Sequence, residues 1–115
     1  MMNAGDVGSY CVVFTTLSNG EDARSLVKRL VADRLVACGT IIDNAVSIYQ
    51  WQGKLEETPE VLVILKTRKD NWEQLRAMVH KLHPYDVPEL LALPVDGCLP
   101  AYLAWLAEQT TQESR

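Results

Sequence analysis

The stretch ACGTIIDNAVSIYQWQGKLEETPEVLVILKT, residues 37–67, is the most informative about the fold because it predicts one long β-hairpin. Both halves are rich in β-branched and aromatic residues, which favour strands. Between them stands Gln52-Gly53, where glycine permits the positive φ of a tight turn. Pro59 has no amide hydrogen for a strand ladder, so we expect it at an edge or a bulge. Residues 61–65 are apolar at every position, and such a strand needs cover on both faces.

A strand and a helix are predicted before the hairpin, and a helix, a strand and a further helix after it. Residues 10–16 have strand composition, and Ser18 and Glu21 have the spacing of a capping box that starts a helix. Apolar residues recur at helical spacing over residues 23–31 and 72–82, which predicts a helix in each segment. The first of these helices is expected to end near Leu35. A short strand at residues 89–95 and a last helix at residues 99–106 follow. The result is an α+β, ferredoxin-like βαββαβ sandwich with an extra C-terminal helix.

This arrangement leaves one side of the sheet largely uncovered, because the one small C-terminal helix is not expected to cover it. Both crossover helices of a ferredoxin-like unit cover the same face. Because residues 61–65 present apolar side chains to both faces, we expect a partner subunit on the other one. The 115 residues are predicted to form a single domain over residues 10–108, with flexible ends at residues 1–9 and 109–115.

Composition excludes several classes of function. The net charge of -4 offers no basic surface for nucleic acid. The chain has no apolar run of membrane-spanning length, and its first nine residues lack the features of a signal peptide, so we expect a cytoplasmic protein without a membrane partner. The three cysteines, Cys11, Cys38 and Cys98, show no paired spacing and are expected to be reduced. Without a phosphate-binding glycine loop or a nucleophile elbow, the sequence does not predict an enzyme.

Both histidines lie in VHKLHPYDVPELLALPV, residues 79–95. His80 and His83 have the spacing of a chelating pair on a helix, but Pro84 disfavours helical geometry at His83 and should end the helix near Leu82. We therefore interpret His80 as a solvated helix residue. His83 stands near Tyr85 at a junction between elements, where functional side chains gather. A ligand role and a structural role both remain open for it.

Four segments together resemble the CutA family, small proteins associated with divalent-cation tolerance. They are LVACGTII (residues 35–42), SIYQWQGKLEETPEVLVILKT (47–67), HPYDVPELLALPV (83–95) and YLAWL (102–106). The resemblance implies a ferredoxin-like subunit in a homotrimer, with the hairpin reaching onto a neighbour and a fold similar to PII signalling proteins. Many relatives have Pro-Gly where this chain has Asp43-Asn44, yet Asn44 tolerates the left-handed conformation that a bend requires.

The resemblance also implies binding of a divalent metal, copper in particular, with Cys38 and His83 among the matching positions. A thiol and an imidazole suit copper or zinc. A closed site needs about four ligands, and donors from two subunits could complete one. Cys38 is a poor candidate for a nucleophile because it follows the C-terminus of a helix, whose dipole disfavours a thiolate.

A polar set is predicted to line a cleft between subunits, where a metal or a small anionic ligand would bind: Tyr49, Glu60, Lys66, Tyr85 and Glu89. The alternative is that Lys66 and Glu60 simply pair at the rim of the sheet. Trp51 is expected to be a trimer contact at the hairpin tip. Two functions thus remain open: a trimeric metal-binding protein in copper or divalent-cation tolerance, and a PII-like module that signals through a small molecule in the cleft.

Overall fold

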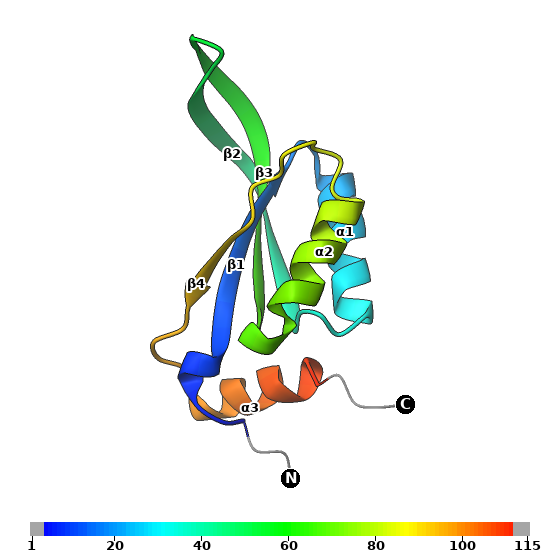
Figure 1. Ribbon diagram of the computed structural model, residues 1–115, viewed down its shortest axis with the longest axis vertical. Helices are drawn as coiled ribbons and strands as arrows, with labels where there is room; N and C mark the ends of the chain where they lie inside the picture. The colour runs from blue at the N-terminus through cyan, green and yellow to red at the C-terminus, as the bar shows by residue number, and fades with distance from the viewer. Residues whose placement is uncertain (1–3, 112–115) are drawn as a thin grey trace.

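The computed structural model describes residues 4–111 and confirms the predicted order of elements (Figure 1). In chain order these elements are β1 (Tyr10–Leu17), α1 (Gly20–Ala32), β2 (Cys38–Trp51), β3 (Lys54–Arg68), α2 (Trp72–Leu82), β4 (Leu91–Pro94) and α3 (Pro100–Gln109). Two 3-10 turns, η1 (Val7–Ser9) and η2 (Lys69–Asn71), precede β1 and α2. Within this range no helix has both the length and the apolar character that a membrane span requires.

The four strands form one antiparallel sheet in the order β2-β3-β1-β4. Helices α1 and α2 lie together on one face of it (Figure 1). Alternate residues of β3, namely Val61, Val63 and Leu65, are buried in the core cluster that includes Leu30 of α1 and Leu75 of α2. Burial on every second position is what a strand covered by helices on one side requires. The fold is therefore the ferredoxin-like α+β sandwich that the sequence predicts.

The opposite side of the sheet, here called the open face, carries exposed apolar side chains. Ile42, Leu91 and Leu93 point to this side and are 44%, 58% and 48% exposed. Helix α3 packs only at one end of it, where Leu106 and Tyr10 belong to a small separate cluster. A bare apolar face is thus present in the single subunit, as the apolar run at residues 61–65 predicts.

The hairpin extends well beyond the rest of the sheet. Pairing between β1 and β3 ends at Leu17 and Val61, so residues 45–60 form a two-stranded ribbon of their own (Figure 1). Gln52 and Gly53 have φ of 51° and 80°, the signature of a type I′ turn. Pro59 lies in this ribbon, where β2 is the only neighbouring strand among the described residues. This edge position agrees with the expectation from its missing amide hydrogen.

The predicted bend at Asn44 is confirmed. Its φ is 67°, in the left-handed region that asparagine tolerates, and the strand register shifts between Ile42 and Ala45. The resulting bulge marks the point where the ribbon leaves the main sheet.

The ends of α1 differ from the prediction, whereas the end of α2 agrees with it. Asn19, and not Ser18, caps α1, because its Oδ1 accepts the Asp22 amide hydrogen at 2.8 Å. The helix ends at Ala32, earlier than the predicted Leu35, and Arg34 then takes a positive φ of 59°. Helix α2 ends at Leu82, and His83 before the proline is extended at φ -73° and ψ 135°.

The two chain ends are described only in part. Val7–Ser9 forms a 3-10 turn within the segment predicted to be flexible, and the Tyr10 hydroxyl donates to the carbonyl of Ala4. At the other end Thr110 is buried. Residues 1–3 and 112–115 lie outside the described residues, so the proposed domain limits remain a prediction.

Candidate functional site

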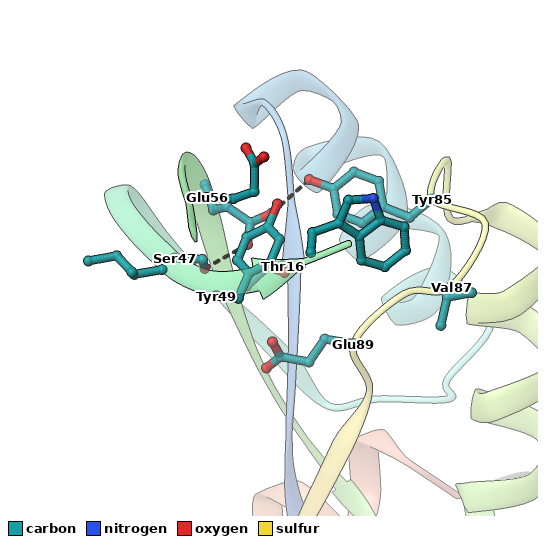
Figure 2. A pocket seen from close by; sticks show the side chains of 10 residues that line it. Thr16, Ser47, Tyr49, Glu56, Tyr85, Val87 and Glu89 are labelled. Atoms are coloured by element: carbon teal, nitrogen blue, oxygen red, sulfur yellow. Dashed lines mark hydrogen bonds between the residues drawn. The ribbon is translucent and has the colours of Figure 1, made fainter. Parts of the chain in front are cut away.

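A hollow of about 800 Å³ lies where the ribbon meets the connector between α2 and β4, residues 83–90 (Figure 2). Ser47, Tyr49 and Trp51 of β2 line it from one strand. These three residues occupy every second position of the strand, so their side chains point to the same side. Tyr85 and Glu89 approach from the connector, which Pro84 and Pro88 stiffen. The site is therefore assembled from segments that lie far apart in the sequence.

Strand β3 supplies two carboxylates to the hollow, Glu56 and Glu60. Glu56 is the cross-strand partner of Tyr49, which places it directly beside that ring. With Glu89 the hollow has three glutamates, and the described residues that line it include no lysine, arginine or histidine. Its electrostatic potential consequently favours a cation over an anion.

Glu60 is held by two hydroxyl groups. The Ser47 hydroxyl donates to its Oε1 at 2.7 Å, and the Tyr85 hydroxyl donates to its Oε2 at 2.7 Å. Burial raises the pKa of Tyr85 to about 12, and the hydrogen bond with Glu60 and the negative charge of that carboxylate add to the effect. The phenol therefore stays protonated at neutral pH and remains a donor.

His83 fastens the connector to the sheet. The residue is 6% exposed, its Nε2 lies 2.8 Å from the carbonyl oxygen of Thr16, and its Nδ1 accepts the Tyr85 amide hydrogen at 3.1 Å. Because Nδ1 accepts, the hydrogen bonds assign the ring proton to Nε2. Burial lowers the pKa of His83, against the opposing influence of the Thr16 carbonyl and the charges of Glu60 and Asp22. Both ring nitrogens of the neutral imidazole are thus occupied.

Cys38 lies elsewhere, at the start of β2. Its Sγ is 3.8 Å from Lys66 Nζ, and the same ammonium donates to Thr40 Oγ1 at 2.6 Å. Nearby, burial raises the pKa of Tyr102, with smaller contributions from Cys38 and Cys98. This region borders the open face and is separate from the hollow.

The structure does not bring the two predicted metal ligands together within one subunit. Cys38 pairs with Lys66, whereas Thr16, the contact of His83, pairs with Leu62 at a separate position along β3. The interval from Leu62 to Lys66 spans about 13 Å of strand, far beyond the reach of a shared metal ion. Across residues 4–111 there is no group of three or more His, Cys, Asp or Glu side chains that could hold a metal ion.

Four of the predicted cleft residues line the hollow: Tyr49, Glu60, Tyr85 and Glu89. Lys66 does not, and no ion pair joins it to Glu60 among the residues that the structure describes. Lys66 is thus not part of the hollow, and its predicted pairing with Glu60 was wrong. Trp51, predicted as a trimer contact, lines the hollow of its own subunit. Whether a second subunit closes the hollow remains a prediction.

Sequence reasoning missed Glu56, Ser47 and Thr16 as lining residues. For Glu56 a signal was available, because counting outward from the Gln52-Gly53 turn places it opposite Tyr49. Thr16 offered none, since it lies near the end of β1 and reaches the hollow only through the pairing of distant strands.

The fold and the hollow define a small ferredoxin-like α+β protein with a projecting hairpin and an acidic cavity at its base. The family described as "CutA1 divalent ion tolerance protein" matches residues 11–109. The divalent-cation tolerance protein CutA of Pyrococcus horikoshii is 44% identical over 99 residues, which cover 86% of this chain and 96% of that protein. The chain belongs to the CutA1 divalent ion tolerance protein family.

Solved structures agree with this assignment. The divalent cation tolerance protein (Cut A1) from Thermus thermophilus superposes with a TM-score of 0.86 at 42% identity, covering 89% of this chain and 99% of that one. CutA1 from Oryza sativa gives 0.88 at 35% identity, with 94% and 100% covered. The names of the Pyrococcus and Thermus proteins refer to tolerance and not to a catalysed reaction.

Proposed function

We propose that this protein acts in divalent-cation tolerance as a homotrimer that binds a divalent metal, copper foremost, without catalysing a reaction. Membership in the CutA1 divalent ion tolerance family carries the proposal. The open face and the ribbon support the assembly, and the position of Cys38 supports the metal.

The ribbon supports oligomerisation because an isolated two-stranded hairpin is marginally stable in water. In the single subunit it projects from the sheet with Val46, Ile48 and Leu55 exposed. A second copy that covers these side chains and the open face would remove a large apolar area from water. Three copies related by a threefold axis would cover both the ribbon and the open face of each subunit in a closed assembly.

A metal ion needs more donors than one subunit offers, because its described residues contain no ligating group of three. The residues of a single chain therefore do not fit a metal site. Cys38 borders the open face, where a neighbouring copy can bring further donors, and its half-buried thiol suits Cu(I). His83 is a weaker candidate because both of its nitrogens are engaged.

Metal titration of freshly reduced protein tests the proposal. Donors from two subunits, repeated at the three interfaces of a trimer, predict one copper ion per chain, and dissociation of the assembly should abolish tight binding. Cys38→Ser is expected to lower Cu(I) affinity about tenfold or more, as losing a ligand does. His83→Ala should leave that affinity unchanged, as should the solvated control His80→Ala. Wild-type affinity in Cys38→Ser would remove this thiol from the site.

The second candidate is a PII-like module that binds a small molecule, and the size of the hollow favours it. About 800 Å³ is within the range of small-molecule pockets, whereas a bare ion needs far less space. A stabilisation screen with metals on one side and small organic ligands on the other separates the two functions, because only a ligand that binds the folded state raises the melting temperature.

We place the protein in the cytosol. Its three cysteines are free, and thiols that stay unpaired are typical of a reducing compartment. Reduced thiols in protein isolated under alkylating conditions would support this location.

A further inference from the structure

The acidic hollow combines three carboxylates with three aromatic rings. Glu56, Glu60 and Glu89 supply the negative charge, and the rings belong to Tyr49, Trp51 and Tyr85. In the view of Figure 2, Glu56 and Glu89 lie on opposite sides of Tyr49. A cation that enters the hollow would thus meet negative charge from more than one side.

The geometry does not suit a bare metal ion. Each oxygen of Glu60 already accepts a hydroxyl hydrogen at 2.7 Å, which leaves this carboxylate less acceptor capacity for coordinating an ion. Within residues 4–111 the three glutamates do not converge as a metal-binding group. An organic cation makes a smaller demand, because it needs hydrogen-bond acceptors and aromatic faces within about 6 Å and not direct coordination.

Aromatic side chains in the hollow point to the same class of ligand. The faces of tyrosine and tryptophan carry negative quadrupole charge, which attracts ammonium and guanidinium groups. Tyr49 and Trp51 stand on one side of β2, and Tyr85 faces them from the connector. The apolar side chain of Val87 can contact the hydrocarbon part of a ligand.

We propose that this hollow binds a small organic cation with a primary ammonium or guanidinium group. Glu56 and Glu89 neutralise the charged group, the aromatic rings contact its face or its methylene chain, and Glu60 holds the wall of the hollow in place. This site is independent of the proposed metal site at Cys38, because the two lie in different parts of the subunit.

Calorimetric titration with three matched probes tests the charge preference, with a chelator present so that no metal contributes. Agmatine carries a guanidinium and an ammonium group, 4-guanidinobutyrate replaces the ammonium by a carboxylate, and glutarate carries only carboxylates. Affinity should fall in that order, and the affinity for agmatine should decrease as salt rises. Equal affinity for agmatine and glutarate, or no agmatine binding to the wild type, would overturn the proposal.

Substitutions locate the binding. Glu56→Gln and Glu89→Gln should each weaken agmatine binding about two- to fivefold, typical of an exposed charge pair, and the double variant more. Glu57→Gln is the matched control, because strand alternation points this exposed neighbour to the other side of the ribbon. An equal loss in Glu57→Gln would show that only the general charge of the ribbon matters.

Nuclear magnetic resonance gives a readout that does not depend on substitution. Agmatine should shift the indole N–H signal of Trp51, which lines the hollow, and leave those of Trp72 and Trp105 in place. Shifts confined to Trp105 on α3 would put the ligand elsewhere and overturn the assignment. A hollow already filled by a side chain from a second copy would show no shift at all, which also contradicts the proposal.

Discussion

The Tyr85 hydroxyl donates to Glu60 Oε2 at 2.7 Å and so joins the connector to β3 where the ribbon begins. The two residues are 25 positions apart in the chain. Because Glu60 also accepts from Ser47 on β2, one carboxylate links three segments. The shape of the hollow therefore depends on this group as much as on the strands.

Tyr85→Phe should lower stability modestly. The variant keeps the ring but removes a hydrogen bond to a charged acceptor, which for this half-buried pair is worth about 1 kcal/mol. A melting temperature roughly 4 °C lower is expected at fixed protein concentration. Tyr49→Phe is the control, since its hydroxyl contacts Thr58 on the exposed ribbon and should matter less. Equal melting of Tyr85→Phe and wild type would mean that the bond adds nothing.

Stability should fall in mild acid because of His83. Burial lowers its pKa in the folded state, so the unfolded chain, with a pKa near 6.5, takes up a proton first. The contribution is therefore fully present above about pH 6.5 and is lost as the pH falls toward the lowered pKa of the folded protein. Protonation would also break the bond from the Tyr85 amide to Nδ1. Urea unfolding at about pH 7.5 and about pH 5 measures the difference.

His83→Gln separates this titration from other acid effects. The variant should be less stable than wild type at neutral pH, because it loses one or both hydrogen bonds of the ring. Its loss of stability between the two pH values should be smaller than that of wild type, since no imidazole titrates at this position. The same pH dependence in both proteins would assign the effect to another group.

The open face gives a direct test of assembly. Light scattering at micromolar concentration should show about three times the subunit mass of 12.9 kDa. Ile42→Glu places a charge on the open face and should shift the protein toward monomers. Val31→Glu on α1 is a matched control, because Val31 is 40% exposed and Ile42 is 44% exposed. Dissociation by both variants, or by neither, would contradict an interface on this face.

Gly39 is required where β2 passes under α1. A Cβ at this position would lie 2.6 Å from Val27 Cγ1, with Leu65 Cδ2 at 3.1 Å. Gly39→Ala should therefore destabilise the fold by about 1–3 kcal/mol, the usual range for overpacking. Gly97→Ala is the control, because a Cβ there meets nothing within 4 Å. Chemical denaturation of the two variants in parallel gives the comparison, and similar stability would show that the core relaxes around the new methyl group.

The regular elements were predictable because short-range chemistry fixes them. Alternating and helical apolar patterns gave the order of strands and helices, and Gln52-Gly53 gave the turn. Pro84 ended α2 through its steric effect on His83. The cap of α1 fell one residue away from the prediction, since Asn19 and Ser18 are both good capping residues and only the backbone geometry selects one.

The site was predictable in part. Tyr49, Glu60, Tyr85 and Glu89 meet because the hairpin register and the stiff connector bring them together. The pairing of Lys66 with Glu60 fails for a reason that strand geometry alone supplies. Both residues belong to β3, and the interval between them spans about 20 Å along the strand, too far for an ion pair.

Local sequence was enough to predict the order of the elements, the hairpin turn, the bend at Asn44 and the apolar side chains on both sides of β3 at residues 61–65. These depend on backbone preferences and on periodicity within a few residues. The role of His83, a neutral side chain that holds the connector to the sheet, depends on a tertiary contact, because its partner Thr16 is 67 residues away. The distance between Cys38 and His83 and the acidic lining of the hollow likewise depend on the tertiary structure. Such contacts follow from strand order and packing, which set the environment of a side chain and are not encoded in its neighbours along the chain.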